Sequence, residues 1–190
     1  ERRGEILAVA ERIFVEKGFE GATVRKIADE VGLSSTALYM HFADKGEILN
    51  EICRYAFESL LDRQLQCTSS GLEPVECVAG LARGYIAFGM EHPNAYRLAY
   101  MTPTLPSADG QETVAQQAAA QLYANFVTAI DAAIRAGQLQ GDVTVVAQIL
   151  WASVHGLVSL MITKPSFAWA EQDVLVEAQI EGLLKGFSPA

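Results

Sequence analysis

The residues best suited to make specific chemical contacts lie in one short stretch near the start of the chain, from Ser34 to His41. Hydroxyl groups come first, and a phenol, a thioether and an imidazole follow. If the stretch is helical, Ala37, Leu38 and Phe42 face inward. Small hydroxyl-bearing side chains then allow close approach to a nucleic-acid groove, and the phenol can reach a phosphate or a base edge. The outward-facing residues are Ser35, Thr36, Tyr39, Met40 and His41.

Two short helices around a tight turn would present this stretch. Apolar residues between Val24 and Val31 recur at the spacing of one buried helix face, and Thr23 ahead of them is a good N-cap. Gly32 tolerates a positive φ at a helix end, and Ser34 or its neighbour can cap a second helix that runs to about His41 or Phe42. Such a pair forms a helix-turn-helix, whose second helix enters the major groove of DNA.

The run from Ile6 to Leu49 resembles the DNA-binding domain of the TetR (tetracycline-repressor-like) transcriptional regulators. This run is about the first quarter of the chain, and the remainder resembles the family chiefly in its helix order. The pattern is specific because many separate elements agree. They are the apolar helix ending in Phe14 and Gly18-Phe19, the Thr23 cap, Ile27-Ala28, Gly32-Leu33-Ser34, Leu38-Tyr39, His41-Phe42, Lys45 and Leu49.

The resemblance implies an all-α homodimer of about nine helices that binds palindromic double-stranded DNA. We expect a three-helix helix-turn-helix head over residues 1–46 and an effector-binding and dimerisation bundle over residues 47–190. The implied function is that of a ligand-responsive repressor, released from its operator by a small hydrophobic effector. Activation is compatible with the same DNA contacts. The alternative is a helical protein-interaction module without sequence-specific DNA binding.

The expected DNA contacts extend beyond the second helix of the motif. Asp44 and Glu47 form a capping box that opens the next helix, and Lys45 stands in its first turn. An ammonium group there opposes the positive end of the helix dipole unless a phosphate compensates. We therefore interpret Lys45 as a phosphate contact. Thr23, Arg25 and Ser34 complete the expected set.

The net charge of −9 opposes a nonspecific attraction to DNA. Between Thr23 and Lys45 the three cations and three anions cancel. We therefore expect binding to depend on a few placed contacts and on helix N-termini that donate backbone N–H groups to phosphates. A dimer repeats these contacts on the two halves of a palindrome.

A helix expected over Val143–Thr163 carries apolar residues at nearly every angular position. A helix that is apolar on all sides must be covered on all sides, so a second copy of the chain should cover one of them. Together with a closing helix over Glu171–Phe187, it should form a four-helix dimer interface. The expected interface residues are Val154, Leu157, Met161, Leu175, Ala178 and Leu183.

Aromatic and thioether residues are spread over the helices that should surround a cavity in the bundle. Plain core packing is the alternative. Trp151 and His155 share a helix face, and the W-x-x-x-H-G run resembles a motif of one C-terminal subgroup of the family. The segment Thr102–Gly110, with two prolines, should be irregular and could act as a flap. The candidate effector residues are Tyr85, Phe88, Tyr96, Tyr100, Met101, Phe126, Trp151 and His155.

Catalysis is not expected, and neither is a cofactor or a metal. The three histidines lie far apart in the chain, and no nucleophile elbow, metal-ligand spacing or glycine-rich phosphate loop is present. Three cysteines, Cys53, Cys67 and Cys77, show no C-x-x-C spacing, which favours isolated thiols in a reducing cytoplasm.

Composition favours a soluble, cytoplasmic protein without a membrane partner. Hydrophobic residues make up 51% and charged residues 19% of the chain, which excludes a disordered protein. No apolar run is expected to reach the length of a membrane span. Because the first residue is Glu1 rather than Met, we expect a native N-terminal arm to be missing.

Overall fold

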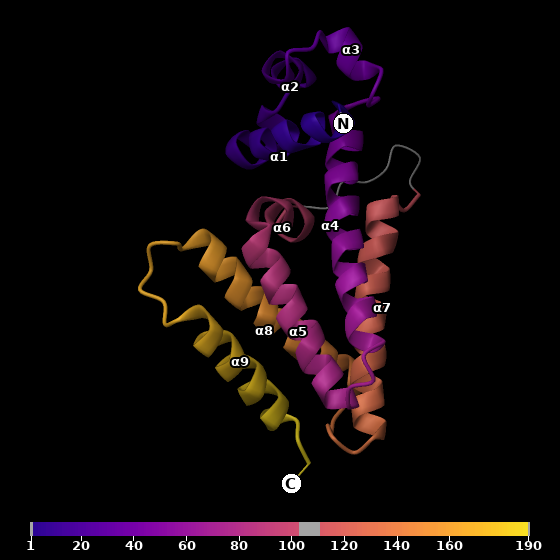
Figure 1. Cartoon of the computed structure of the whole chain (residues 1–190), viewed down its shortest axis with the longest axis vertical. Helices are drawn as coiled ribbons and strands as arrows, with labels where there is room; N and C mark the ends of the chain where they lie inside the picture. Colours follow the sequence, from indigo (N-terminus) through magenta and orange to yellow (C-terminus); the bar gives the residue numbers. More distant parts are fainter. Residues whose placement is uncertain (1, 103–110, 190) are drawn as a thin grey trace. The chain divides into compact units, whose positions relative to one another are not determined.

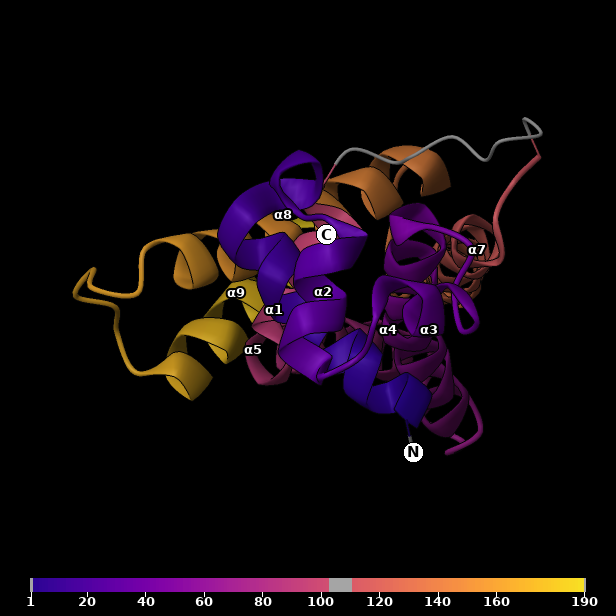
Figure 2. The ribbon, with the colours of Figure 1, turned by 90° about the horizontal axis from the view of Figure 1, so that it is seen from above.

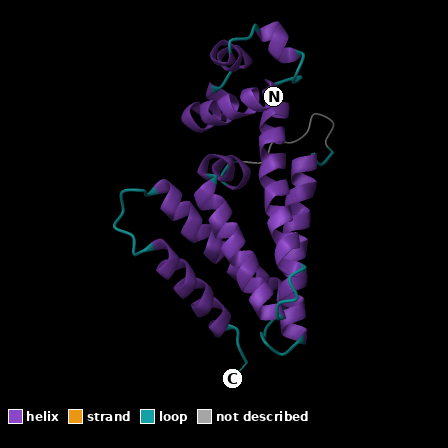
Figure 3. Ribbon diagram, viewed as in Figure 1, coloured by secondary structure: helices purple, strands orange, loops and turns teal. Residues whose placement is uncertain are grey.

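The computed structural model describes residues 2–102 and 111–189, and all regular structure within them is helical (Figures 1 and 3). The expected all-α class is confirmed, with nine helices among the described residues. The predicted flap at Thr102–Gly110 lies outside these residues except for Thr102. The helices are α1 (Arg2–Gly21), α2 (Val24–Val31), α3 (Ser35–Tyr39), α4 (Lys45–Thr68), α5 (Pro74–Glu91), α6 (Pro93–Tyr100), α7 (Val114–Arg135), α8 (Val143–Thr163) and α9 (Gln172–Gly186).

The chain packs as two units. Unit 1 consists of residues 1–58 and 92–118, and unit 2 consists of residues 59–91 and 119–190. Helices α4 and α7 therefore contribute residues to both. These two units are defined by how residues pack. The predicted division into residues 1–46 and 47–190 concerns function instead, and it stays a prediction.

The core of unit 1 joins α1, α2, α3, the first half of α4 and α6. Helix α2 packs against both α1 and α3, as the two views show (Figures 1 and 2). The apolar spacing read from the sequence is the spacing of the buried face. Its fully buried members are Ile6, Ala10, Ile27, Ala28, Leu38 and Ile48.

Short-range caps define the helix-turn-helix. The Thr23 hydroxyl accepts a hydrogen bond from the backbone N–H of Lys26 at 3.2 Å, and the Ser34 hydroxyl accepts one from Ala37 at 3.1 Å. Gly32, at φ 72°, ends α2 in the left-handed region, as its type predicts. Helix α3 ends at Tyr39, earlier than expected, because the His41 N–H turns back to the Leu38 carbonyl at 2.9 Å.

The predicted capping box opens α4. The Asp44 carboxylate accepts from the Glu47 N–H at 2.8 Å, and the Glu47 carboxylate accepts from the Ala43 N–H at 2.6 Å. These two bonds satisfy backbone donors that the first turn of a helix leaves unpaired.

Unit 2 is built on α5, which packs against both α8 and α9. Helix α8 has the predicted bounds, and the Asp142 carboxylate caps it by accepting from the N–H groups of Thr144 and Val145, both at 3.0 Å. The buried centre of the unit includes Val78, Phe126, Ile130, Leu139, Val146 and Leu150.

The expectation that no apolar run reaches the length of a membrane span is wrong for α8. Among the described residues, this one helix is long and apolar enough to cross a membrane by length and composition. That is weak evidence for a membrane segment, because the core helix of a soluble protein passes the same test.

Candidate functional site

The recognition face of α3 is exposed in unit 1. Tyr39 is 53% exposed and Met40 is 84% exposed, while Leu38 beneath them is fully buried. Thr36 is also exposed, and Ser35 and His41 are half-buried. The outward face expected from the sequence is therefore present, and its contact with DNA remains a prediction.

The capping hydroxyls of Thr23 and Ser34 can each still donate a hydrogen bond at the same surface. Each oxygen accepts a backbone N–H, so its own hydroxyl proton remains available as a donor. A phosphate oxygen at the N-terminus of α2 or α3 could receive that proton together with the backbone N–H groups of the first turn.

Arg25 is a highly exposed cation of the motif. Its side chain is 85% exposed, and the Asp29 carboxylate is 3.9 Å away in the next turn of α2. Such an exposed pair contributes little to stability, so the guanidinium can turn to a phosphate at small cost. This placement agrees with the predicted role of Arg25.

Lys45 has partners that the sequence did not suggest. Its ammonium donates to the carbonyl oxygens of Phe19, at 2.8 Å, and Ala22, at 3.4 Å, and it lies 4.3 Å from the centre of the Phe19 ring. The Glu20 carboxylate is 3.8 Å away. These groups compensate the ammonium without a phosphate, so the physical reason given for a phosphate contact is wrong, although the contact itself stays untested.

The predicted effector residues divide between the two units. In unit 1, Tyr96 is fully buried and its ring centre lies 5.0 Å from that of Tyr100, which meets Phe57 edge-on at 5.4 Å. Met101, at the end of α6, is exposed. This group is an aromatic cluster of unit 1.

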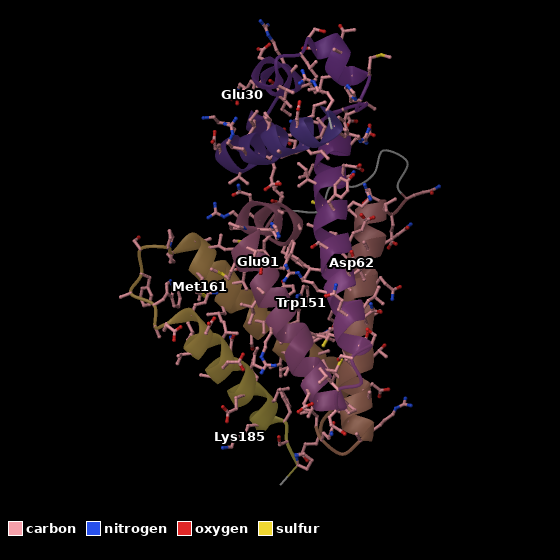
Figure 4. All side chains as sticks on the ribbon, viewed as in Figure 1. Glu30, Asp62, Glu91, Trp151, Met161 and Lys185 are labelled. Atoms are coloured by element: carbon pink, nitrogen blue, oxygen red, sulfur yellow. The ribbon has the colours of Figure 1, made fainter. Side chains whose placement is uncertain are left out.

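In unit 2, three predicted residues, Tyr85, Trp151 and His155, form a hydrogen-bonded group with Ser159, which we call the Tyr85 cluster. The indole N–H of Trp151, labelled in Figure 4, donates to the Tyr85 hydroxyl at 3.3 Å. That hydroxyl lies 3.2 Å from His155 Nδ1, and Ser159 Oγ lies 3.1 Å from His155 Nε2. Burial lowers the pKa of His155, which favours the neutral imidazole with one donor and one acceptor.

Sequence reasoning missed two members of this neighbourhood. Ser159 lies one helical turn after His155, and a polar residue at that spacing in an apolar helix could have indicated a partner. The Tyr123 ring lies 5.5 Å from that of Trp151, and its buried hydroxyl has no hydrogen-bond partner among the described residues. An unpaired buried hydroxyl is a place where a ligand atom or a water would gain a hydrogen bond.

Phe88 and Phe126, the two remaining candidates, are buried core residues of unit 2. Phe126 also lines a small apolar pocket. The enclosed space is about 10 Å³, barely the room that one water molecule needs, so this pocket holds no effector in the present conformation. Its other lining residues are Val78, Ala79, Ala82, Leu150, Val154, Ile180, Leu183 and Leu184.

The predicted dimer residues of α8 have little exposed surface. Val154, Leu157 and Met161 are buried within unit 2, and their contact with a second chain stays a prediction. Of the predicted α9 residues, Leu175 and Leu183 are half-buried and Ala178 is exposed. An all-round apolar helix does not indicate which side its own chain covers. The exposed residues of the two helices include Val145, Ile149, Ala152, Leu160, Val174 and Ala178.

Two cysteines are neighbours rather than isolated thiols. Cys67 Sγ in α4 lies 4.0 Å from Cys77 Sγ in α5, and the surroundings raise the pKa of Cys77 to about 11, mainly by burial and secondarily by Cys67. A Cβ atom added to Gly80 would lie 2.6 Å from Cys67 Sγ, so α5 approaches this sulfur closely. In the described part of the chain, no cluster of three or more metal-ligating side chains is present.

Two family models match the chain. Residues 6–52 match a model described as "Bacterial regulatory proteins, tetR family", and residues 78–183 match one described as "Tetracyclin repressor-like, C-terminal domain". The second match alone covers more than half of the chain.

Individual relatives share part of the sequence. The HTH-type transcriptional repressor KstR2 of Mycobacterium tuberculosis is 37% identical over 99 residues, which are 52% of this chain and 49% of the relative. The HTH-type transcriptional activator FasR of Mycolicibacterium smegmatis is 28% identical over 120 residues, which are 62% of this chain and 55% of the relative. The chain thus spans about half the length of the curated relatives that it matches.

Solved structures share the fold. The structure of AibR in complex with isovaleryl coenzyme A and operator DNA matches with a TM-score of 0.77 at 20% identity, over 100% of this chain and 99% of that one. At that identity the likeness establishes the fold alone.

Proposed function

Because the chain belongs to the TetR family of transcriptional regulators, we propose that it represses its target genes by binding a palindromic operator as a homodimer and that a small hydrophobic effector releases it. The family membership supports a DNA-binding transcriptional regulator over an enzyme. The single observation that carries the mechanism is the exposed α3 face above a fully capped helix-turn-helix.

The DNA contacts proposed for this head are few, and each comes from a defined position on α2 or α3. Tyr39 and Thr36 reach base edges or phosphates from α3, and Arg25 reaches a phosphate from α2. The hydroxyls of Thr23 and Ser34 and the helix N-termini behind them supply further donors. The functional division into a DNA-binding part, residues 1–46, and an effector-binding and dimerisation part, residues 47–190, belongs to the same proposal.

Dimerisation is proposed to use the exposed apolar residues of α8 and α9 instead of the buried ones. Leu160 is 50% exposed and Val174 is 60% exposed, and side chains of this size seldom gather on the surface of a monomer. Two copies that join through such a face would hold their α3 helices about 34 Å apart, or at a multiple of that distance, on one side of the duplex. The operator is therefore a palindrome.

The effector is proposed to bind in unit 2 near the Tyr85 cluster, with its polar group facing Tyr85, His155 and Tyr123. The unpaired Tyr123 hydroxyl and the mixed aromatic and hydroxyl chemistry support this placement. AibR is described with a coenzyme A thioester, and KstR2 is described as a ketosteroid regulator. These two chemical classes are the first to test.

A footprint on DNA tests the function. The full-length protein should protect a palindromic segment of the DNA around its own gene. Tyr39→Ala should weaken that binding about 30-fold or more, because each contact contributes about 1–3 kcal/mol and the dimer makes it twice. Tyr55→Ala is the matched control, since Tyr55 in α4 is 51% exposed and lies outside the motif. An absent footprint at low salt would refute the proposal and favour the protein-interaction module.

Fluorescence tests the effector. Trp169→Phe leaves Trp151 as the one tryptophan, since the chain has two. Isovaleryl coenzyme A or a ketosteroid should then change the emission of Trp151 and lower operator affinity. If neither class changes the emission or the melting temperature, the Tyr85 cluster is a structural network.

Activation is the second candidate outcome. FasR, which matches more of this chain than KstR2 does, is described as an activator. The proposed DNA contacts are identical in the two cases. A reporter gene behind the footprinted segment, compared with and without the protein, distinguishes the two. Such a regulator works in the cytoplasm, where we place it.

A further inference from the structure

Four cations of the DNA-binding head share an arrangement that the proposed DNA contacts do not explain. Each of four cationic side chains donates to a carbonyl oxygen at or just after the C-terminal end of a helix in unit 1. The last carbonyls of a helix lack helical partners and carry the negative end of the helix dipole, whereas the His41 carbonyl lies two residues beyond the end of α3. The donors and acceptors are Arg2 and Val31 (3.2 Å), Arg3 and His41 (2.6 Å), Lys26 and Gly21 (3.1 Å), and Lys45 and Phe19 (2.8 Å).

Arg3 contacts two other segments of the head, the one after α3 and α4. Its guanidinium donates to the His41 carbonyl directly after α3 and lies 4.1 Å from the centre of the Phe42 ring. The same group lies 3.6 Å from the Glu47 carboxylate and 3.5 Å from the Glu51 carboxylate, both in α4. One planar group therefore joins α1, the segment after α3, and α4. A guanidinium can bond, stack and pair at once, which an ammonium cannot do.

The environment keeps the Glu51 carboxylate charged. Hydrogen bonds from Arg54, and secondarily the charge of Arg3, lower the pKa of Glu51, so its carboxylate is ionised at neutral pH. Glu51 is mostly buried, with 17% of its side chain exposed, and so salt screens this pair less than a fully exposed one. The charge of Arg3 is thus balanced within the head before DNA arrives.

We propose that Arg3 is a positioning residue that fixes the end of the recognition helix against α4, and that it does not contact a DNA phosphate. This inference rests on the proposed operator binding. An arginine near DNA can contact a phosphate or remain solvated, and the geometry gives Arg3 a third role. With Arg2, Lys26 and Lys45 also bonded to carbonyls, Arg25 is the main phosphate contact of the motif.

The two roles differ in their salt dependence. A side chain that neutralises a phosphate adds about 0.9 to the slope of log K against log salt, whereas a positioning residue adds nothing to it. A positioning residue instead affects binding to the correct sequence more than binding to random DNA. Lysine in place of arginine keeps the charge for a phosphate and loses the planar group for positioning.

Anisotropy titrations of the full-length protein, on its footprinted operator and on a random duplex, between about 50 and 200 mM salt, test this. Arg3→Lys should lower operator affinity about tenfold, with an unchanged slope and unchanged binding to the random duplex. Arg25→Ala is the matched control and should reduce the slope by about 0.9 per head. Full operator affinity in Arg3→Lys, or a reduced slope in Arg3→Ala, would overturn the inference.

Glu51→Gln provides an opposing test. Removal of a negative charge near DNA should strengthen binding if only electrostatics matter. If Glu51 holds Arg3, operator affinity should fall while binding to the random duplex does not. The losses in Arg3→Lys and Glu51→Gln should then combine less than additively, since both act on one contact. Additive losses, or tighter operator binding by Glu51→Gln, would contradict the inference.

Hydrogen exchange separates a failure of this inference from a failure of operator binding, because it needs no DNA. In Arg3→Lys, the peptide that covers residues 35–44 should exchange faster than in the parent, and the peptide that covers α8 should not change. Unchanged exchange at residues 35–44 refutes the positioning role. A parent protein that protects no DNA refutes the proposed function, whatever the exchange shows.

Discussion

The head in unit 1 and the helical bundle in unit 2 are held in different ways. In the head, short helices are fixed by caps and by cations on carbonyl oxygens, as at Thr23, Ser34 and Arg3. In unit 2, long helices are fixed by apolar burial, together with polar contacts such as the Tyr85 cluster and the Arg83–Glu177 ion pair. The comparison teaches that short helices depend on local polar bonds in addition to their core, whereas long bundle helices depend mainly on which helix face is covered.

Burial in unit 2 predicts the largest effect. Leu157→Ala should lower the free energy of unfolding by about 2–5 kcal/mol, because Leu157 is only 8% exposed and truncation leaves a cavity. Leu160→Ala, three residues on and 50% exposed, should change it by less than about 0.5 kcal/mol in a monomer. Chemical denaturation measures both. Equal losses at low protein concentration would contradict the assignment of faces on α8.

The same pair of positions sharpens the dimer proposal. Leu160→Glu should shift sedimentation toward the monomer, because it places a charge on the exposed apolar face of α8. Leu157→Ala should leave the association state unchanged wherever the variant remains folded. A monomeric parent protein at micromolar concentration would remove the basis for the exposed face as an interface.

The cysteine pair predicts the next largest effect, again in unit 2. Diamide should take one hydrogen from each thiol, joining Cys67 to Cys77 and lowering the mass by about 2 Da. The disulfide closes a short loop and should raise the free energy of unfolding by about 2–3 kcal/mol, provided that the sulfurs can approach from 4.0 Å without strain. Mass spectrometry and thermal melts measure these changes.

Cys53 supplies the control for that experiment. It lies in unit 1, where burial raises its pKa to about 12, and Cys53→Ser should leave the mass change intact. Cys67→Ser or Cys77→Ser should abolish it. A bond that forms between chains instead would show that the two sulfurs of one chain cannot meet.

The caps of the head predict a smaller loss. Thr23→Ala and Ser34→Ala should each lower the free energy of unfolding by about 1 kcal/mol, since each hydroxyl satisfies one N–H at a helix start. Both should also weaken operator binding. Asp142→Ala removes the corresponding cap of α8 in unit 2 and should cost a similar amount with little effect on operator binding. Equal effects of all three on DNA binding would erase the contrast between the two regions.

The titration of His155 predicts the smallest effect. Its folded-state pKa is below the unfolded value because burial disfavours the imidazolium. The unfolded chain then binds more protons, so stability is complete above the ordinary histidine pKa and falls as pH drops below it. The melting temperature should therefore fall between about pH 7.5 and 5, and less so in His155→Gln. An identical fall in both proteins would assign the effect to other groups.

Local signals made most of the head predictable. The caps at Thr23, Gly32, Ser34 and Asp44 depend on residues within one turn, so the sequence carries them directly. The same applies to α8, whose start at Asp142 and whose length were predicted correctly. Helix α3 was predicted too long because nothing in its letters shows that His41 turns back to Leu38.

Contacts between distant segments explain the rest. Lys45 meets the carbonyls of Phe19 and Ala22 across the head, and no periodicity indicates such a bond. The face of α8 that its own chain covers depends on where α5 and α9 lie, so the burial of Val154 and Leu157 within unit 2 could not be read from the sequence. The aromatic residues expected to line one cavity divide between two units because residue type does not indicate location.

Because α5 approaches the Cys67 sulfur closely, we expect the residues at positions 67 and 80 to change together during evolution. A Cβ atom at position 80 would need the space that this sulfur occupies. Alanine at position 80 should therefore be tolerated in homologues that carry a smaller residue at position 67, such as glycine or alanine, and be selected against beside cysteine. Substitutions at the two positions should arise together, and a lineage that lost this cysteine would be free to replace the glycine.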